Sequence, residues 1–371
     1  MKNKFFEEIR GKFGFGCMRL PMVGEQVDLE QFEKMVDGFL AAGLNYFDTA
    51  QVYIGGQSET ALRKCLTARY PRERFVLTDK LSGSCFETEA DIRPFFQSQL
   101  EACGVEYFDF YLMHAQNARN FVKYKACRAY ETAFELKKEG KIRHVGISFH
   151  DTAEALDQIL TEYPEIEAVQ IQFNYVDYED PVVQSRRVYE TAARHGKPVI
   201  VMEPVKGGKL VDLPAEAQKI FDDLQGGSNA SYAIRFAAGF ENMMMVLSGM
   251  STLEQLEENV AYMADFKPLS EAERAAVEQV QKIFRSQGLI PCTAFRYCVD
   301  GCPMRIPIPD LFSLANSKKQ FPKSDYESAY TFRTKDKGKA SDCVKCGACE
   351  RICPQKLPVR SLLEEVAESF E

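Results

Sequence analysis

The feature that most constrains the fold is an alternation, between about residues 13 and 265, of short β-type runs with longer amphipathic stretches. In the amphipathic stretches, apolar residues recur three and four positions apart, which is the spacing of one buried helix face. The β-type runs end near eight positions, which are Cys17, Asp48, Lys80, His114, Ser148, Gln172, Met202 and Ser248. Eight strand–helix units favour an α/β fold of the closed (β/α)8 type, the TIM barrel, over an open doubly wound sheet.

The open-sheet alternative lacks its usual signature. A dinucleotide-binding sheet would show the pattern G-x-G-x-x-G between its first strand and first helix. Here the segment Gly14-Phe15-Gly16 lacks both the third glycine and a following helix. The runs 145–148 and 198–201 are short and mainly apolar, as strands that are covered on both faces should be. The closed barrel is therefore the predicted fold.

Cysteine supplies the second constraint. Seven of the twelve cysteines lie between residues 292 and 353, and the other five are scattered singly. In a reducing compartment such clustering indicates metal or redox chemistry rather than disulfides. From residue 343 the chain reads C-x2-C-x2-C-x3-C-P, which is the spacing of bacterial ferredoxins. Zinc is the alternative, but zinc ligands tend to form separated C-x2-C pairs.

The upstream half of the cysteine region, residues 292–303, has the same register, but Phe295 stands where the second cysteine belongs. Cross-ligation then predicts one complete 4Fe–4S site, whose ligands are Cys302, Cys343, Cys346 and Cys349. A second site would have three thiolates, those of Cys292, Cys298 and Cys353. Three thiolates suit a 3Fe–4S cluster, or a 4Fe–4S cluster with one iron held by another ligand. The alternative is that this half holds no cluster.

The composition changes after Gly288, where Pro, Cys, Gly and Lys become frequent and helical periodicity fades. We therefore expect two domains: a barrel over residues 1–287 and a small ferredoxin-like iron–sulfur domain over residues 288–371.

Local patterns near this boundary make three further predictions. Ser270 and Glu273 have the spacing of a capping box, which predicts a helix that continues to about residue 285. Residues 316–340 are polar and lysine-rich, so we expect a surface excursion there. Apolar residues between 357 and 370 predict a closing amphipathic helix.

Charge and hydropathy exclude several functions. The 46 basic and 54 acidic residues give a formal net charge of −8, so no electrostatic footprint for nucleic acid or an anionic membrane is present. The first residues contain no apolar core of a signal peptide. No apolar run reaches the roughly 18 residues that a transmembrane helix needs. We expect a cytoplasmic protein.

Four residues at the ends of successive predicted strands form a usable chemical set. Asp48, Tyr53, Lys80 and His114 would all lie at the C-terminal face of the barrel, where the chemistry of such barrels collects. A lysine beside a phenol lowers the phenol pKa, which makes the phenol a better proton donor. Each residue alone has an ordinary explanation, such as a turn cap, a loop aromatic, a solvated lysine or a core histidine. The combination is what indicates catalysis.

Several segments carry a resemblance to the aldo–keto reductase family. They are Gly14–Pro21, Asn45–Tyr53, Asp79-Lys80, Asp109–His114, Val145–Ser148 and Gln170–Asn174, within residues 13–263. The resemblance implies a barrel that uses nicotinamide to reduce a carbonyl, with the catalytic tetrad Asp48, Tyr53, Lys80 and His114. It also implies that Ser148 and Gln170 hold the nicotinamide carboxamide, and that the backbone passes the cofactor at Gly16 and Cys17. The other expected cofactor contacts are Met202, Ser248, Gly249, Gln255, Glu258 and Asn259.

The chain departs from the family at the cofactor positions. Met202 stands where the family usually stacks an aromatic ring on the nicotinamide. Gly249 and Gln255 replace the lysine and arginine that typically grip a 2′-phosphate, whereas the Glu258-Asn259 pair is kept. Because two charge-assisted contacts are lost, NADPH and NADH are both candidate cofactors. A barrel that has lost nicotinamide binding is the plainer alternative.

The sequence therefore predicts an oxidoreductase that reduces a small-molecule aldehyde or ketone, with Tyr53 as general acid. The clusters would stabilise the fold or carry electrons. Nicotinamide releases two electrons together and a cluster accepts one at a time, so an electron route would need a flavin such as FMN. Lys345, Arg351 and Lys356 flank the complete motif and are either solvated or a docking site for ferredoxin or flavodoxin. The alternative function is an electron-transfer protein whose barrel binds a flavin or serves as a docking scaffold.

Overall fold

The computed structural model describes residues 3–181, 183–224, 226–292, 296–322, 324–353 and 356–371. The chain divides into two compact units. The first comprises residues 1–179, 183–210 and 227–274, and the second comprises residues 180–182, 211–226 and 275–371. Each unit is described by itself.

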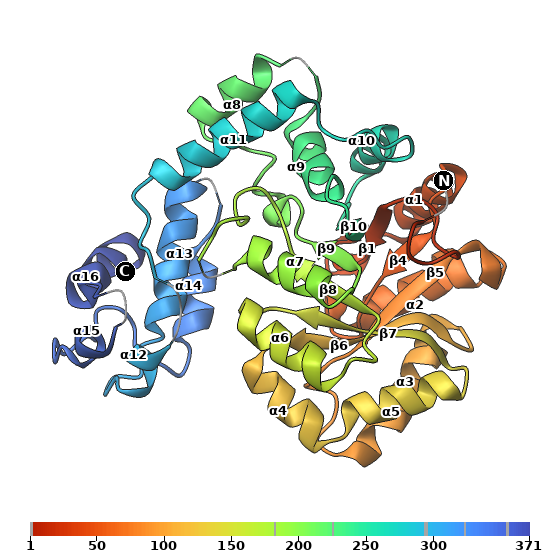
Figure 1. Ribbon diagram of the computed structural model, residues 1–371, viewed down its shortest axis with the longest axis horizontal. Helices are drawn as coiled ribbons and strands as arrows, with labels where there is room; N and C mark the ends of the chain where they lie inside the picture. The colour runs from red at the N-terminus through yellow and green to blue at the C-terminus, as the bar shows by residue number, and fades with distance from the viewer. Residues whose placement is uncertain (1–2, 182, 225, 293–295, 323, 354–355) are drawn as a thin grey trace. The chain divides into compact units, whose positions relative to one another are not determined.

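The first unit is built on a closed barrel of eight parallel strands (Figure 1). In barrel order after β1, each strand pairs with its sequence neighbour, and β10 closes the ring against β1. The strands are β1 (Phe13–Gly16), β4 (Tyr46–Asp48), β5 (Val76–Leu81), β6 (Phe108–Gln116), β7 (Ile142–Phe149), β8 (Ala168–Gln172), β9 (Val199–Met202) and β10 (Met243–Ser248). The predicted fold class is confirmed, because all eight β-type runs of the sequence are barrel strands.

Burial on both faces explains the composition of these strands. Every residue of β5 and β10 is buried. One face of a barrel strand points into the barrel interior, where it meets side chains of the other strands, and the opposite face is covered by helices. Gly146 in β7 shows how close the packing is. A Cβ at this position would lie 2.7 Å from the backbone oxygen of Ala168 and 2.7 Å from the side chain of Leu112.

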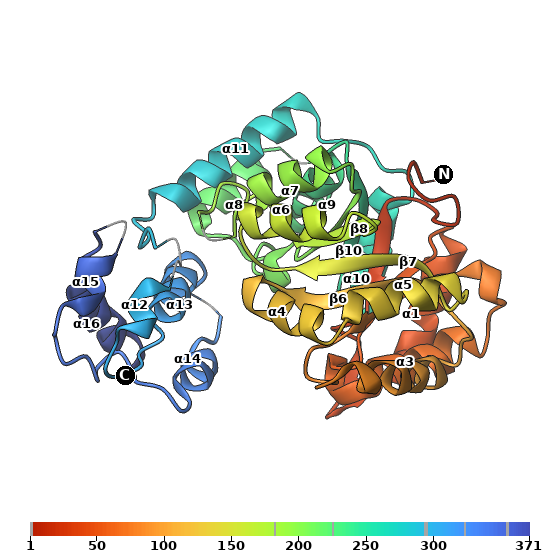
Figure 2. The ribbon, with the colours of Figure 1, turned by 60° about the horizontal axis from the view of Figure 1, so that its bottom comes forward.

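Helices follow the strands and surround the barrel (Figures 1 and 2). They are α1 (Leu29–Ala41), α2 (Gln57–Leu62), α3 (Glu89–Cys103), α4 (Ala118–Ala126), α5 (Ala129–Lys138), α6 (Ala153–Glu162), α7 (Ser185–Arg194), α9 (Asn229–Ala238) and α10 (Leu253–Met263). A two-stranded hairpin, β2 (Met22–Val23) and β3 (Gln26–Val27), follows β1. None of the described helices combines the length and the apolarity that crossing a bilayer requires.

Helix α1 illustrates how the sequence sets these helices. The Asp28 carboxylate accepts a hydrogen bond from the Gln31 amide and so caps the first turn. Phe32, Val36 and Phe39 recur on one face and are buried in the barrel core. The cap fixes where the helix begins, and the apolar face fixes which side packs on the barrel.

The second unit is helical. It contains α8 (Ala215–Asp222), most of α11 (Glu271–Ser286), α12 (Tyr297–Asp300), α13 (Ile308–Gln320), α14 (Glu327–Thr334), α15 (Ala348–Ile352) and α16 (Val359–Phe370). A small hydrophobic core includes Ile308, Leu311, Phe312 and Leu363, and the cysteines pack against this core or belong to it.

Two of the local predictions in this region are confirmed. Helix α11 opens with the predicted capping box, in which Ser270 N–H donates to Glu273 and Glu273 N–H donates to the Ser270 hydroxyl. The closing amphipathic helix is α16.

The surface excursion predicted over residues 316–340 is wrong. The end of α13 and the whole of α14 lie there. Tyr326 and Tyr330 are buried in the small core, and the Tyr330 hydroxyl donates to Glu371 over 2.5 Å. Burial of these two tyrosines holds the segment against the small core despite its polar composition. The predicted domain boundary at residues 287/288 stays a prediction. The division into compact units falls elsewhere, because α11 from Ala275 onward groups with the second unit.

Candidate active site and iron–sulfur sites

The four predicted catalytic residues come together at the C-terminal ends of neighbouring strands. Asp48 is the last residue of β4, Lys80 lies near the end of β5, and His114 lies near the end of β6. Tyr53 begins a short 3-10 turn, η1 (Tyr53–Gly56), in the loop after β4. Because β4, β5 and β6 are adjacent in the barrel, their ends bring the four side chains to one place.

A buried ion pair forms the base of this group. The Lys80 ammonium lies 2.5 Å from Asp48 Oδ1 and 2.7 Å from the Thr49 backbone oxygen, and Lys80 is fully buried. The Gln170 amide donates to the other Asp48 oxygen over 3.0 Å. Burial by itself would lower the pKa of Lys80, but the charges of Asp48 and Tyr53 outweigh burial and raise that pKa. Lys80 therefore stays charged at neutral pH.

The Tyr53 phenol lies against this ammonium. The Lys80 Nζ atom is 4.8 Å from the centre of the Tyr53 ring. Burial raises the pKa of Tyr53 above its usual value of about 10, and the Lys80 charge and hydrogen bond offset only part of this effect. Lys80 lowers the phenol pKa, as expected, but burial outweighs this effect and the net pKa is raised. The sequence could not show how deeply the phenol is buried.

His114 lies beside the phenol in its neutral form. Its ring meets the Tyr53 ring edge-on, with centres 5.9 Å apart. Burial first, and then the nearby Lys80 charge, lower the pKa of His114 to about 3. The ring atom Nδ1 lies 2.7 Å from the Ser82 hydroxyl, which leaves Nε2 for a substrate oxygen. Ser82 was missed in the sequence, although it follows Lys80 by two positions at the same strand end.

The residues predicted to hold the nicotinamide lie on the next strands of the barrel. Ser148 and Gln170 are register neighbours on β7 and β8, and both are buried. Gly16 pairs with Asp48, and the Cys17 amide donates to the Asp48 backbone oxygen over 2.8 Å. The Cys17 thiol is fully buried, and burial raises its pKa well above the usual value. This thiol therefore fills part of the barrel core, as Cys65, Cys103 and Cys127 do.

The later cofactor positions surround the ends of β9 and β10. Met202 ends β9 and is half-buried, and Glu258 is exposed. The Asn259 amide donates to the Ser248 hydroxyl over 3.4 Å. Gln255 is not free to replace an arginine, because its side-chain oxygen accepts from the Ser251 amide over 2.8 Å.

Arg19 is a cation at this rim that the sequence analysis did not single out. A Cβ on Gly249 would lie 3.3 Å from the Arg19 Cβ, and one Arg19 nitrogen donates to the Gly207 oxygen over 3.3 Å. The missing side chain at Gly249 makes room for the Arg19 stem. A positive charge therefore remains at the ends of β1, β9 and β10 although the lysine of the family is lost.

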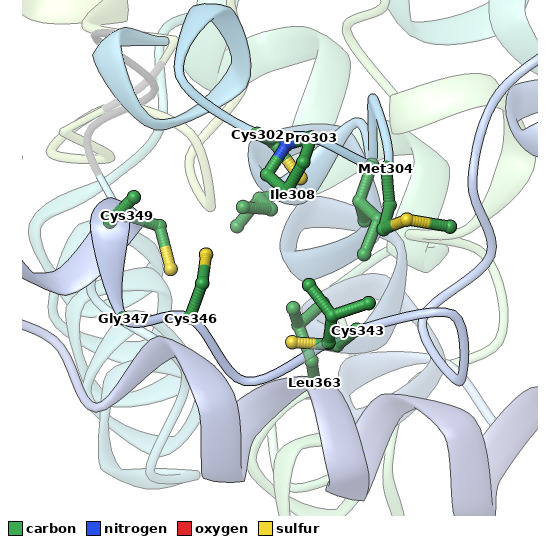
Figure 3. Close-up of a pocket in the computed structure, with 12 residues that line it drawn as sticks. Cys302, Pro303, Met304, Ile308, Cys343, Cys346, Gly347, Cys349 and Leu363 are labelled. Atoms are coloured by element: carbon green, nitrogen blue, oxygen red, sulfur yellow. The ribbon is translucent and has the colours of Figure 1, made fainter.

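The four cysteines that the spacing assigns to the complete iron–sulfur site lie around one pocket. Cys302, Cys343, Cys346 and Cys349 line this pocket, together with apolar residues that include Met304, Ile308 and Leu363. Figure 3 shows the sulfur atoms of these cysteines directed toward the same space. Four thiolates around an apolar pocket fit a 4Fe–4S cluster, and among these four cysteines only Cys346 is exposed.

The cysteines of the incomplete half belong to the small core or pack against it: Cys353 is part of the core, and Cys292 and Cys298 pack against it. Burial raises the pKa of Cys298 to about 11, and the charges of Cys292, Cys349 and Cys353 add to this rise. Phe295, which stands at the second cysteine position of this half, lies outside the described residues.

The fold and the two sites define an oxidoreductase barrel with an iron–sulfur domain, and comparison with known proteins agrees. The aldo/keto reductase family model matches residues 12–282, and a 4Fe-4S dicluster domain matches residues 291–357. The chain belongs to the aldo/keto reductase family, which confirms the resemblance seen in the sequence.

Individual relatives are similar over most of their length. An aldo-keto reductase of Strobilurus tenacellus is 26% identical over 321 residues, with 75% of this chain and 91% of that protein covered. The NADH-specific methylglyoxal reductase of Escherichia coli is 26% identical, with 59% and 78% covered. The holo form of an aldo-keto reductase from Bacillus halodurans has 25% identity and a TM-score of 0.59, with 72% and 91% covered. A Klebsiella pneumoniae aldo-keto reductase in complex with NADPH shares the fold, at 20% identity, a TM-score of 0.61, and 76% and 96% covered.

The shared pocket predicts the effect of replacing Cys302, the proposed ligand that is most distant in sequence from the other three. Cys302→Ser should remove one 4Fe–4S cluster from anaerobically purified protein, because Cys302 completes the set begun at Cys343. Iron analysis and EPR of the reduced protein measure this loss. Cys127→Ser, in the barrel core, is the control and should leave the iron content unchanged. Equal iron in the two variants, or zinc in place of iron, would contradict the assignment.

Proposed function

We propose that this protein reduces an aldehyde or ketone with NADPH or NADH and that Tyr53 is the general acid. The observation that carries the proposal is the buried Asp48–Lys80 pair beneath the Tyr53 ring. A phenol in such a place stays protonated until a substrate oxygen develops negative charge. The ammonium beneath it then stabilises the phenolate that remains.

Each residue of the group has a distinct part in this scheme. The nicotinamide, when bound, supplies a hydride to the carbonyl carbon. Tyr53 donates its proton to the carbonyl oxygen, and Lys80 stabilises the phenolate. Asp48 keeps Lys80 in place and charged. Neutral His114, fixed through Nδ1 by Ser82, orients the carbonyl oxygen through Nε2.

The strand-end residues support binding of the cofactor. Ser148 and Gln170 offer a hydroxyl and an amide for the nicotinamide carboxamide, and Gly16 leaves the backbone accessible beside Ser248. Met202 takes the place of the stacking aromatic ring. Gly249, Gln255, Glu258 and Asn259 are proposed contacts of the adenosine half, and Arg19 supplies the positive charge for a phosphate.

The iron–sulfur domain adds one-electron chemistry to this enzyme. We assign the complete cluster to Cys302, Cys343, Cys346 and Cys349. A 3Fe–4S or incompletely ligated 4Fe–4S cluster is assigned to Cys292, Cys298 and Cys353. If the clusters exchange electrons with the barrel, FMN is the agent that would divide the electron pair, and ferredoxin or flavodoxin is the external partner. The observation that favours such an electron-transfer function is the dicluster domain itself.

The acid role is tested by removing one hydroxyl. Tyr53→Phe should lower the rate of carbonyl reduction by NAD(P)H about 10²- to 10⁴-fold, which is the usual contribution of a general acid. Steady-state kinetics on a panel of aldehydes and ketones, with cluster content checked by EPR, measure the effect. Tyr70→Phe removes a hydroxyl that bonds Asp37 on the barrel exterior and is the matched control. Unchanged turnover in Tyr53→Phe would favour the electron-transfer function.

The pKa directions predict the pH profile. The acid form of Tyr53 persists because its pKa is raised, and His114, with a pKa of about 3, is neutral throughout. kcat should therefore be nearly flat from about pH 5 to pH 9 and should fall only as Tyr53 ionises at higher pH. The profile is measured in overlapping buffers of constant ionic strength. A limb near pH 6.5 that disappears in His114→Gln would show that the histidine titrates in the working range.

The second cluster is tested by restoring the register of the sequence. The natural chain should show a 3Fe–4S EPR signal in the oxidised state, or a 4Fe–4S signal altered by added ligands, because three cysteines are available. Phe295→Cys should replace this signal with that of a second ordinary 4Fe–4S cluster. Two ordinary 4Fe–4S signals in the natural protein would contradict the assignment of three ligands.

A further inference from the structure

Behind Lys80, between strand β5 and helices α2 and α3, lies a buried polar network that the proposed mechanism does not use. Its members are Glu59 of α2, Asp79 of β5 and Gln99 of α3. They are 3%, 0% and 1% exposed, respectively. Such complete burial of two carboxyl groups is costly unless the groups are hydrogen-bonded and their charge is reduced.

The network holds both backbone polar groups of Lys80. One Asp79 oxygen accepts from the Lys80 amide over 2.8 Å. The Gln99 amide donates to the Lys80 carbonyl oxygen over 3.1 Å and to Glu59 over 3.3 Å. The Gln99 oxygen accepts from the Tyr111 hydroxyl over 2.6 Å, which fixes the amide orientation. The strand that carries the catalytic lysine is thereby tied to two helices.

Two carboxyl groups of this network lie close together. One oxygen of Glu59, one oxygen of Asp79 and the Cys103 sulfur all lie within 4.8 Å of one another. Burial raises the pKa of both carboxyl groups, and the Glu59 charge raises that of Asp79 further, well above its usual value. Two ionised carboxylates at this separation would repel strongly without water between them. A proton held between Asp79 and Glu59 would remove this repulsion.

The same network reaches Tyr53 through the chain. Glu59 lies in α2, which begins four residues after Tyr53. The connecting residues Ile54, Gly55 and Gly56 all have positive φ, at 51°, 60° and 87°, so the turn is tight and has little slack. The position of α2 thus sets the position of the phenol, and Glu59 ties α2 to the strand of Lys80.

We propose that Glu59, Asp79 and Gln99 form a proton-sharing clamp that positions Tyr53 over Lys80. The proposal rests on the proposed role of Tyr53 and extends it to residues that do not touch substrate. Loss of the shared proton would place two like charges between α2 and β5 and would push the helix, and with it the phenol, away from the lysine.

Several other titratable groups face the clamp. Lys80 lies on the same strand, and its charge acts on Asp79. Cys103 of α3 donates to Asp79 over 3.7 Å, and Tyr111 of β6 bonds Gln99. The charge of Asp79 also acts on Tyr53 and on Cys85. Since a negative Asp79 raises the Tyr53 pKa, the shared proton keeps the phenol a stronger acid.

Three variants of the full-length, anaerobically purified protein test the clamp. Asp79→Asn keeps a donor to Glu59 and should retain kcat within about threefold, whereas Asp79→Ala should lose about tenfold or more through misplacement of the phenol. Binding of NADPH or NADH, followed by fluorescence, should be similar in both. Tyr70→Phe, whose hydroxyl bonds Asp37 and not the clamp, is again the control and should leave kcat unchanged. Equal losses in Asp79→Asn and Asp79→Ala would overturn the positioning role.

The shared proton has a readout that does not need activity. The infrared spectrum of the natural protein at neutral pH should contain a protonated-carboxyl band that is absent from Asp79→Asn. Absence of this band in the natural protein would overturn proton sharing, even if Tyr53→Phe shows that the phenol is the acid. A stoichiometric metal ion, in addition to the iron of the iron–sulfur clusters, that is lost in Asp79→Asn would show that Glu59, Asp79 and Cys103 form a metal site. That result would overturn the clamp.

Discussion

The buried Lys80–Asp48 ion pair is the interaction on which the proposed catalytic site depends. A charged ammonium without a partner would be very costly at this depth, so Asp48 is required before Lys80 can lie beneath Tyr53. Gln170 satisfies the second Asp48 oxygen, which links the pair to the strand proposed to bind nicotinamide. The same desolvation that strengthens the pair also keeps Tyr53 and His114 uncharged. Burial thus keeps Tyr53 and His114 uncharged, whereas the charges of Asp48 and Tyr53 keep Lys80 charged.

Strand positions could be predicted from the sequence because barrel strands are apolar on both faces and chemistry collects at their ends. Asp48, Lys80 and His114 were identifiable for this reason, and the cysteine spacing identified four cysteines that line one pocket. Side-chain environments could not be predicted in the same way. The raised pKa of Tyr53, the support of His114 by Ser82, and the position of Arg19 over Gly249 all depend on packing between segments far apart in sequence.

The expectation for residues 316–340 failed for a similar reason. Composition counts side chains without regard to where they point, and lysines dominate this segment. Two tyrosines, Tyr326 and Tyr330, are enough to anchor it in a small core. In this small core, single aromatic side chains determine whether a segment packs against it. The average polarity of a segment therefore does not predict whether the segment is packed.

The ligand set of the complete cluster has a consequence for how the C-terminal unit is maintained. Cys302 precedes helix α13, whereas Cys343, Cys346 and Cys349 follow α14, so the proposed cluster would join two stretches that enclose both helices. Binding energy at such a site is also folding energy. Loss of iron from the proposed site would therefore open a loop of some forty residues.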